Sequence, residues 1–149
     1  MGMLSSALIA PKADAKLMAE STAPAQKWQG VDWKSVDHIK FCTLCVILDG
    51  GKLPDVPAVQ ARINQMELLH QVSENGPWVF LIPRALRDLM AGCSTVEDYK
   101  VKSIAEAWGA SEEFSSWKAE DVFKLLEDIT GLADTARLED KELMLWLSM

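Results

Sequence analysis

His38, Cys42 and Cys45 are the residues of this chain whose types and spacing come nearest to a reactive site. Separations of four and three residues place all three side chains on one face of a helix. With Cys93 or His70 as a fourth ligand, that face would offer the nitrogen and sulfur donors of a tetrahedral zinc site. Structural zinc sites usually take ligand pairs from turns, so the favoured interpretation is burial in the core, with no bound metal or cofactor.

Cys42 and Cys45 also form a Cys-x-x-Cys motif. In thioredoxin-like proteins this motif lies at a helix N-terminus, where the helix dipole lowers the thiol pKa. Here both cysteines fall well inside a predicted helix and face its inner side. We therefore expect buried, reduced thiols, and the odd total of 3 cysteines argues against a disulfide framework.

Other catalytic arrangements do not assemble in this sequence. It contains no Gly-x-Ser-x-Gly elbow, and no pair of carboxylates has flanking residues that would raise one pKa. The pair Gly50-Gly51 leads into Lys52-Leu53-Pro54 and not into a helix, which is the wrong context for a phosphate-binding loop. Basic residues are not clustered, which disfavours nucleic acid as a partner. We therefore predict no catalytic residue.

Charge divides the chain into two unlike parts. Residues 94–149 contain 13 Asp and Glu against 6 Lys and Arg, which gives 6 − 13 = −7, whereas residues 1–93 contain 9 of each. A one-sided field of this kind can steer a basic protein partner, although charged helix faces more often only face water. The residues that we expect to form a partner-binding surface are Trp108, Glu112, Glu113, Trp117, Glu120, Asp121, Glu127 and Asp128.

Periodicity and breaking residues predict the elements that position these side chains. Apolar residues at spacings of three and four, together with capping residues, predict helices over 12–20, 33–48, 57–72, 84–91, 95–108 and 118–138. The helix over 33–48 is expected to begin after an Asp32 cap and to have Lys40 and Thr43 on its wetter side. Short apolar runs predict strands over 4–9, 78–82 and 142–149.

Together these elements predict an α+β fold: a single, mainly helical domain over 1–149 with a small sheet of two or three short strands. Residues 21–30 are expected to form a loop with some mobility. A chain of 149 residues that is 49% apolar buries enough surface to fold without metal or disulfides. The 6 tryptophans are expected to form much of the core and its rim.

The chain shows no targeting or membrane signal. Its first ten residues lack the basic start and the long apolar run of a signal peptide. No later segment reaches the roughly 18 uninterrupted apolar residues of a membrane span. We expect a soluble, cytoplasmic protein with no membrane partner, and its oligomeric state stays open.

Several landmarks along the chain resemble those of a family of small bacterial proteins of unknown function, about 150 residues long, that begin Met-Gly-Met or Met-Gly-Val. They are Met1-Gly2-Met3, Val36-Asp37, Lys40, Leu48-Asp49-Gly50, Gly76-Pro77-Trp78-Val79, Leu81-Ile82-Pro83, Ala107-Trp108, Glu112-Glu113-Phe114 and Leu145-Trp146-Leu147-Ser148. The resemblance implies an α+β cytoplasmic domain, and some small bacterial proteins of this general kind act as immunity partners of secreted toxins. It implies no catalytic residue.

The sequence thus favours a non-catalytic protein-binding domain, immunity-like or antitoxin-like, that uses its acidic C-terminal surface to mask a basic site on a partner. A thiol- or metal-dependent enzyme built on His38, Cys42 and Cys45 is the alternative. A self-associating structural protein is a third possibility.

Overall fold

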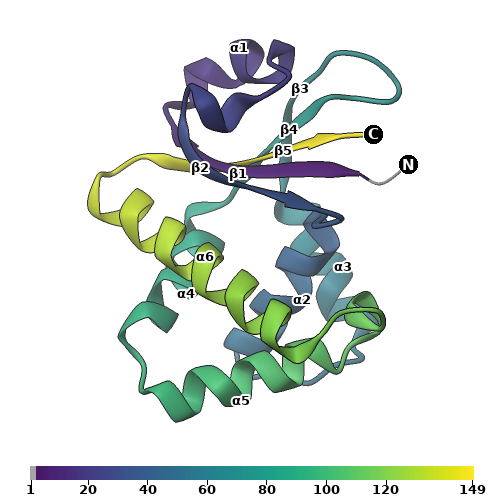
Figure 1. Ribbon diagram of the computed structural model, residues 1–149, viewed down its shortest axis with the longest axis vertical. Helices are drawn as coiled ribbons and strands as arrows, with labels where there is room; N and C mark the ends of the chain where they lie inside the picture. The colour runs from purple at the N-terminus through teal and green to yellow at the C-terminus, as the bar shows by residue number, and fades with distance from the viewer. Residues whose placement is uncertain (1–2) are drawn as a thin grey trace.

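One antiparallel sheet of five strands organises the protein (Figure 1). The computed structural model describes residues 3–149, so Met1 and Gly2 of the opening triplet lie outside the described residues. The strand order is β2-β1-β5-β4-β3, which places the first and last strands of the chain side by side at the centre. The strands are β1 (Leu4–Ala10), β2 (Gln29–Lys34), β3 (Glu67–Gln71), β4 (Trp78–Ile82) and β5 (Glu142–Ser148).

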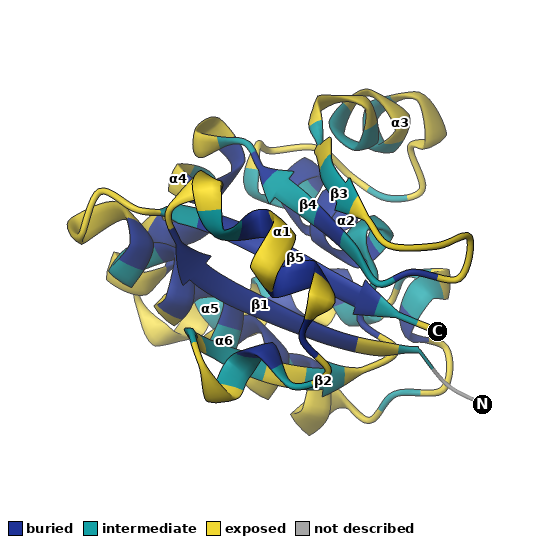
Figure 2. Ribbon diagram, turned by 90° about the horizontal axis from the view of Figure 1, so that it is seen from above, coloured by how far each residue is buried: buried dark blue, intermediate teal, exposed yellow. Residues whose placement is uncertain are grey.

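The helices cover the two faces of this sheet unequally. Helix α1 (Ala15–Glu20) lies on one face, and the remaining α-helices lie on the other (Figures 1 and 2). The remaining helices are α2 (His38–Leu48), α3 (Val56–Gln65), α4 (Arg84–Gly92), α5 (Asp98–Gly109) and α6 (Ala119–Leu138). Four short 3-10 turns join them: η1 (Lys12–Asp14), η2 (Pro24–Gln26), η3 (Cys93–Thr95) and η4 (Glu112–Phe114). None of the helices in residues 3–149 is both long and apolar enough to cross a membrane.

The α+β class is confirmed, but the prediction of two or three short strands is wrong. The two unanticipated strands are the edges of the sheet, β2 and β3. Consequently the predicted helix over 33–48 begins only at His38, and the predicted helix over 57–72 ends at Gln65. Edge strands bury less apolar surface than central ones, so their sequences carry a weak periodic signal. Their pairing decides their conformation: β2 pairs with the distant strand β1, and β3 pairs with the next strand along the chain, β4.

The other elements lie close to their predicted positions. Strands β1, β4 and β5 and helices α4, α5 and α6 are present where apolar periodicity predicts them. Residues 21–30, predicted as a loop, include the turn η2 and the first two residues of β2. Asp37 and not Asp32 caps α2, because the Asp37 side chain accepts a hydrogen bond of 3.1 Å from the backbone N–H of Lys40.

Two apolar clusters fill the two sides of the sheet. Alternation along β1 and β5 directs Ala7, Ile9, Leu143 and Leu145 toward α2, α4, α5 and α6. The intervening side chains, including Trp146, pack under α1. Trp108 and Trp146 are buried and the other tryptophans are partly buried, as expected of core and rim residues. Strands β1 and β5 are therefore covered on both faces, as Figure 2 shows.

Helix α2 is buried around most of its girth, so the expected wetter side does not exist. Lys40 and Thr43 retain only 7% and 5% exposure. The Trp108 indole N–H donates to the Lys40 carbonyl oxygen at 3.1 Å and to Thr43 Oγ1 at 3.0 Å. The Lys40 ammonium lies 5.4 Å from the centre of the Phe114 ring, an arrangement that favours a cation–π interaction. These contacts fix α5 and η4 against α2.

Candidate functional site

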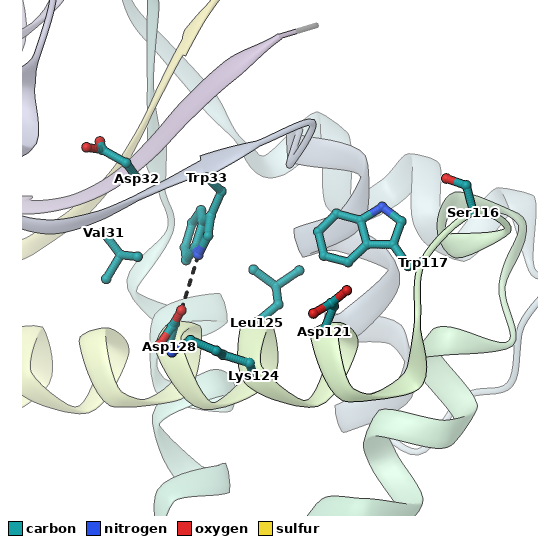
Figure 3. Close-up of a pocket in the computed structure, with 9 residues that line it drawn as sticks. All are labelled: Val31, Asp32, Trp33, Ser116, Trp117, Asp121, Lys124, Leu125 and Asp128. Atoms are coloured by element: carbon teal, nitrogen blue, oxygen red, sulfur yellow. Dashed lines mark hydrogen bonds and ion pairs between the residues drawn. The ribbon is translucent and has the colours of Figure 1, made fainter.

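A groove of about 740 Å³ lies between β2 and the first half of α6. We call it the β2/α6 groove, and it is the hollow shown in Figure 3. Its size is within the range of small-ligand and side-chain binding sites. The lining residues are Val31, Asp32, Trp33, Ser116, Trp117, Asp121, Lys124, Leu125 and Asp128.

Alternation along β2 decides which of its side chains enter the groove. Val31 and Trp33 face the helical side and pack against the larger apolar cluster. Asp32 is on the opposite face, where its carboxylate accepts a hydrogen bond from the hydroxyl of Ser6, its cross-strand neighbour. Figure 3 shows the Asp32 carboxylate pointing away from the other side chains. Asp32 therefore lines the groove with its carboxylate turned away from the other lining side chains.

Helix α6 supplies the floor. Asp121, Lys124, Leu125 and Asp128 are separated by three, one and three residues, which places them along one helical face. The Trp33 indole N–H donates to Asp128 Oδ2 at 3.4 Å, and Lys124 Nζ lies 3.5 Å from Asp128 Oδ1. The charge of Asp128 is thus already partly neutralised inside the groove.

Trp117 forms the opposite wall. Its ring packs edge-on against Phe114, with ring centres 5.1 Å apart and planes at 89°. The Lys40 ammonium is 5.9 Å from the centre of the same indole. Because Phe114 and Lys40 are both buried, these contacts hold Trp117 from behind and leave it partly exposed. In Figure 3 the indoles of Trp33 and Trp117 flank Leu125.

Asp121 is the carboxylate of the groove that is free to meet a ligand. It is exposed and, within residues 3–149, enters no side-chain hydrogen bond or ion pair. It lies in the first turn of α6, where the helix dipole stabilises a negative charge. Two indole walls and an unpaired carboxylate match a cationic group with apolar surroundings, such as the side chain of Arg or Lys.

The structure separates the predicted partner-binding residues into several groups. Trp117, Asp121 and Asp128 come together in the β2/α6 groove. Glu120 and Glu127 are exposed on α6 outside it, while Glu112 and Glu113 line a different hollow.

Trp108 does not contribute to any surface. It is fully buried and bonded to α2, so its prediction as a partner-binding residue is wrong. Its spacing from Ile104 and Ala105 already placed it on the inner face of α5.

The candidate cysteines lie in the core, whereas His38 and His70 are partly buried. Cys42 and Cys45 are completely buried, and burial raises the pKa of each thiol to about 12. Cys42 Sγ lies 3.7 Å from Met66 Sδ, and the His38 ring stacks on Phe80 with centres 5.3 Å apart. Across residues 3–149 no three His, Cys, Asp or Glu side chains are placed to hold one metal ion.

Trp33 is the tryptophan of the groove that sequence reasoning missed. The predicted helix over 33–48 absorbed it, although Val31 and Trp33 alternate with the polar residues Asp32 and Lys34. That period-2 pattern is the signal of a half-buried strand.

Comparisons with known proteins assign neither a family nor a function to the chain. No family model matches the chain, and no curated protein matches it. Among solved structures, the chain is similar to YfbM from Escherichia coli, a protein of unknown function. The identity is 12%, all of both chains is covered, and the TM-score is 0.42. The resemblance to the Met-Gly-Met family stays a prediction.

Proposed function

We propose that this protein is a non-catalytic protein-binding domain whose β2/α6 groove receives an Arg or Lys side chain of a basic partner. The observation that carries the proposal is the arrangement of the Trp33 and Trp117 indoles on either side of Leu125, with the unpaired Asp121 carboxylate in the same groove. An immunity-like or antitoxin-like role, in which this surface masks a basic site of the partner, is the form that we favour.

The groove would act as an anchor within a larger interface. A cation over an indole contributes about 0.5–2 kcal/mol, and an exposed ion pair contributes up to about 1 kcal/mol. One bound side chain therefore gives a dissociation constant of about 1 mM at best, which corresponds to a binding free energy of roughly 4 kcal/mol. A stable complex needs further contacts around the groove, as is usual for anchor residues at interfaces.

The charge distribution supports a basic partner independently of the groove. The net charge of −7 is carried by residues 94–149, which include α5, η4 and α6, whereas the preceding 93 residues are neutral overall. Such a field speeds the encounter with a basic protein, and added salt screens this attraction. We therefore expect added salt to lower the association rate constant much more than it changes the dissociation rate constant.

The test is a tryptophan-fluorescence titration with a short oligoarginine peptide, using oligoglutamate as the negative probe. Trp117→Ala and Asp121→Asn should each weaken oligoarginine binding by several-fold. The matched controls are Trp28→Phe, an indole on the α1 side of the sheet, and Glu106→Gln, an exposed carboxylate of α5. The groove would not be the binding site if all four variants bound oligoarginine with equal affinity, or if the wild type bound oligoglutamate as well as oligoarginine.

The alternative enzyme has no geometric support. Both thiols of the Cys-x-x-Cys motif are sealed in the core with raised pKa values, and His38 stacks on Phe80 instead of meeting them. A nucleophilic thiol needs a lowered pKa and access to its substrate.

A further inference from the structure

A second hollow, of about 460 Å³, lies between α3, the start of α2 and the C-terminal end of α5. We call it the α3/α5 groove. Among the described residues it shares no lining residue with the β2/α6 groove. The segment 111–117 separates the two, since Ser111, Glu112 and Glu113 line one hollow and Ser116 and Trp117 line the other.

The floor of this groove is apolar and incompletely covered. Its apolar lining residues include Ile39, Leu53, Val56, Val59, Ile63 and Ala110. No residue of α3, all of which is described, is fully buried, and Val56 is 75% exposed. Figure 2 shows α3 at the margin of the molecule, with its outer side exposed. An apolar hollow of this kind, bordered by polar residues, is typical of an interaction site.

Two small residues line the α5 side of the hollow. Ala107 lies on α5 and Ala110 follows its last residue, and each has only a methyl side chain. Both alanines are exposed to solvent, so they leave room without serving the core of the domain.

The charges around the groove have a single sign. The described lining residues include Asp55, Glu112 and Glu113 and no Lys or Arg. Asp55 accepts a hydrogen bond from the backbone N–H of Ala58 and so caps α3. The Glu112 and Glu113 side chains, in contrast, form no hydrogen bond or ion pair with the described part of the chain. An apolar floor with an acidic rim is complementary to an apolar segment flanked by basic side chains.

We infer that the α3/α5 groove binds a short amphipathic helix of a partner protein, with apolar side chains along one face and Lys or Arg at its borders. Helices and a loop line the groove, and none of its described lining residues belongs to a strand that could pair with an added one. Side chains must therefore provide the contacts, which is the helix-in-groove mode of recognition. This site does not depend on the β2/α6 groove, because each is lined by different residues.

The probe is a fluorescent synthetic peptide of leucine and lysine whose leucines lie along one helical face. Fluorescence anisotropy measures its binding to the full chain. Ala107→Phe fills the groove, and Glu112→Lys with Glu113→Lys reverses its rim charge; we expect each change to weaken binding about tenfold or more. The matched controls are Ala61→Phe on α3 and Glu106→Lys on α5, both exposed and outside the groove.

The outcomes separate this site from the proposed function. If Trp117→Ala still binds the leucine–lysine peptide and Ala107→Phe does not, the α3/α5 groove is supported. This result holds whether or not the β2/α6 groove binds oligoarginine. The inference is overturned if the peptide does not bind, if Ala107→Phe binds as well as Ala61→Phe, or if a leucine–glutamate peptide binds equally. Sedimentation that shows wild-type dimers and Ala107→Phe monomers would assign the groove to a second copy of the chain and overturn it as well.

Discussion

The two buried thiols of α2 should make the protein lose stability as the pH becomes alkaline. Burial raises the pKa of Cys42 and of Cys45 from the ordinary value of 9.0 to about 12. The folded chain therefore holds these protons in the window from 9.0 to about 12, in which the unfolded chain releases them. The stability that the thiols contribute is fully present below the lower value and is lost as the pH rises through the window.

The size of this effect follows from proton linkage. Each thiol lowers the free energy of unfolding by about 1.4 kcal/mol for each pH unit inside the window. Between about pH 8 and about pH 10, the two thiols together remove about 3 kcal/mol. Urea unfolding at these two pH values measures the change.

The control for this measurement is the double variant Cys42→Ala with Cys45→Ala. Other titrating groups are common to both proteins, so the difference between their pH dependences isolates the thiols. We expect the double variant to lose about 3 kcal/mol less than the wild type over the same interval. Identical pH dependences would refute the reasoning, because they would mean that the thiols titrate alike in the folded and unfolded chains. Rapid alkylation of the native protein near neutral pH would refute it too.

Two further substitutions test the packing that builds the β2/α6 groove. Trp108→Phe removes the indole donor to α2 and leaves Thr43 Oγ1 with one partner fewer, so we expect a loss of about 1–3 kcal/mol in urea unfolding. Gly30→Ala should disrupt the β1–β2 pairing, because a methyl group at this position would overlap the backbone carbonyl of Ala7. We expect it to lower the melting temperature by several degrees or more, whereas Gly131→Ala, with open space around its Cα, should not lower it.

Local signals predicted the elements that depend on local sequence. In α6, Val122, Leu126, Ile129 and Ala133 recur at spacings of three and four, and the helix is present as Ala119–Leu138. β5 is present because its continuous apolar run needs cover on both faces. In both cases the pattern and the tertiary environment demand the same conformation.

Two of the elements that were mispredicted, β2 and the start of α2, depend on distant partners. Strand β2 is held by β1, whose paired residues lie 20 to 30 positions earlier in the chain. Its short alternation was outweighed by the apolar residues that follow it. On α2, helical periodicity placed Lys40 outside, whereas aromatic rings of η4 and its neighbour cover that side. A lysine can be buried there because its ammonium faces aromatic rings.

The candidate site was predictable only in part, and for the same reason. Composition and charge selected Trp117, Asp121 and Asp128, which the chain places within one short stretch. Trp33 enters the groove from β2, 84 residues before Trp117, through a sheet edge that the sequence did not predict. A site that is formed by two distant segments can be predicted only if the secondary structure of both segments is predicted correctly.

The most direct test of the β2/α6 groove is an NMR titration of the tryptophan indole N–H signals with oligoarginine. Each signal can be assigned by replacing one tryptophan at a time with phenylalanine. We predict that the Trp33 and Trp117 signals shift in a saturable manner, since the two indoles line the groove and the Trp33 N–H is bonded to Asp128. The Trp28 and Trp108 signals should stay in place. Shifts confined to Trp28 or Trp108, or no saturable shift at Trp33 and Trp117, would contradict the assignment of this groove to a basic side chain.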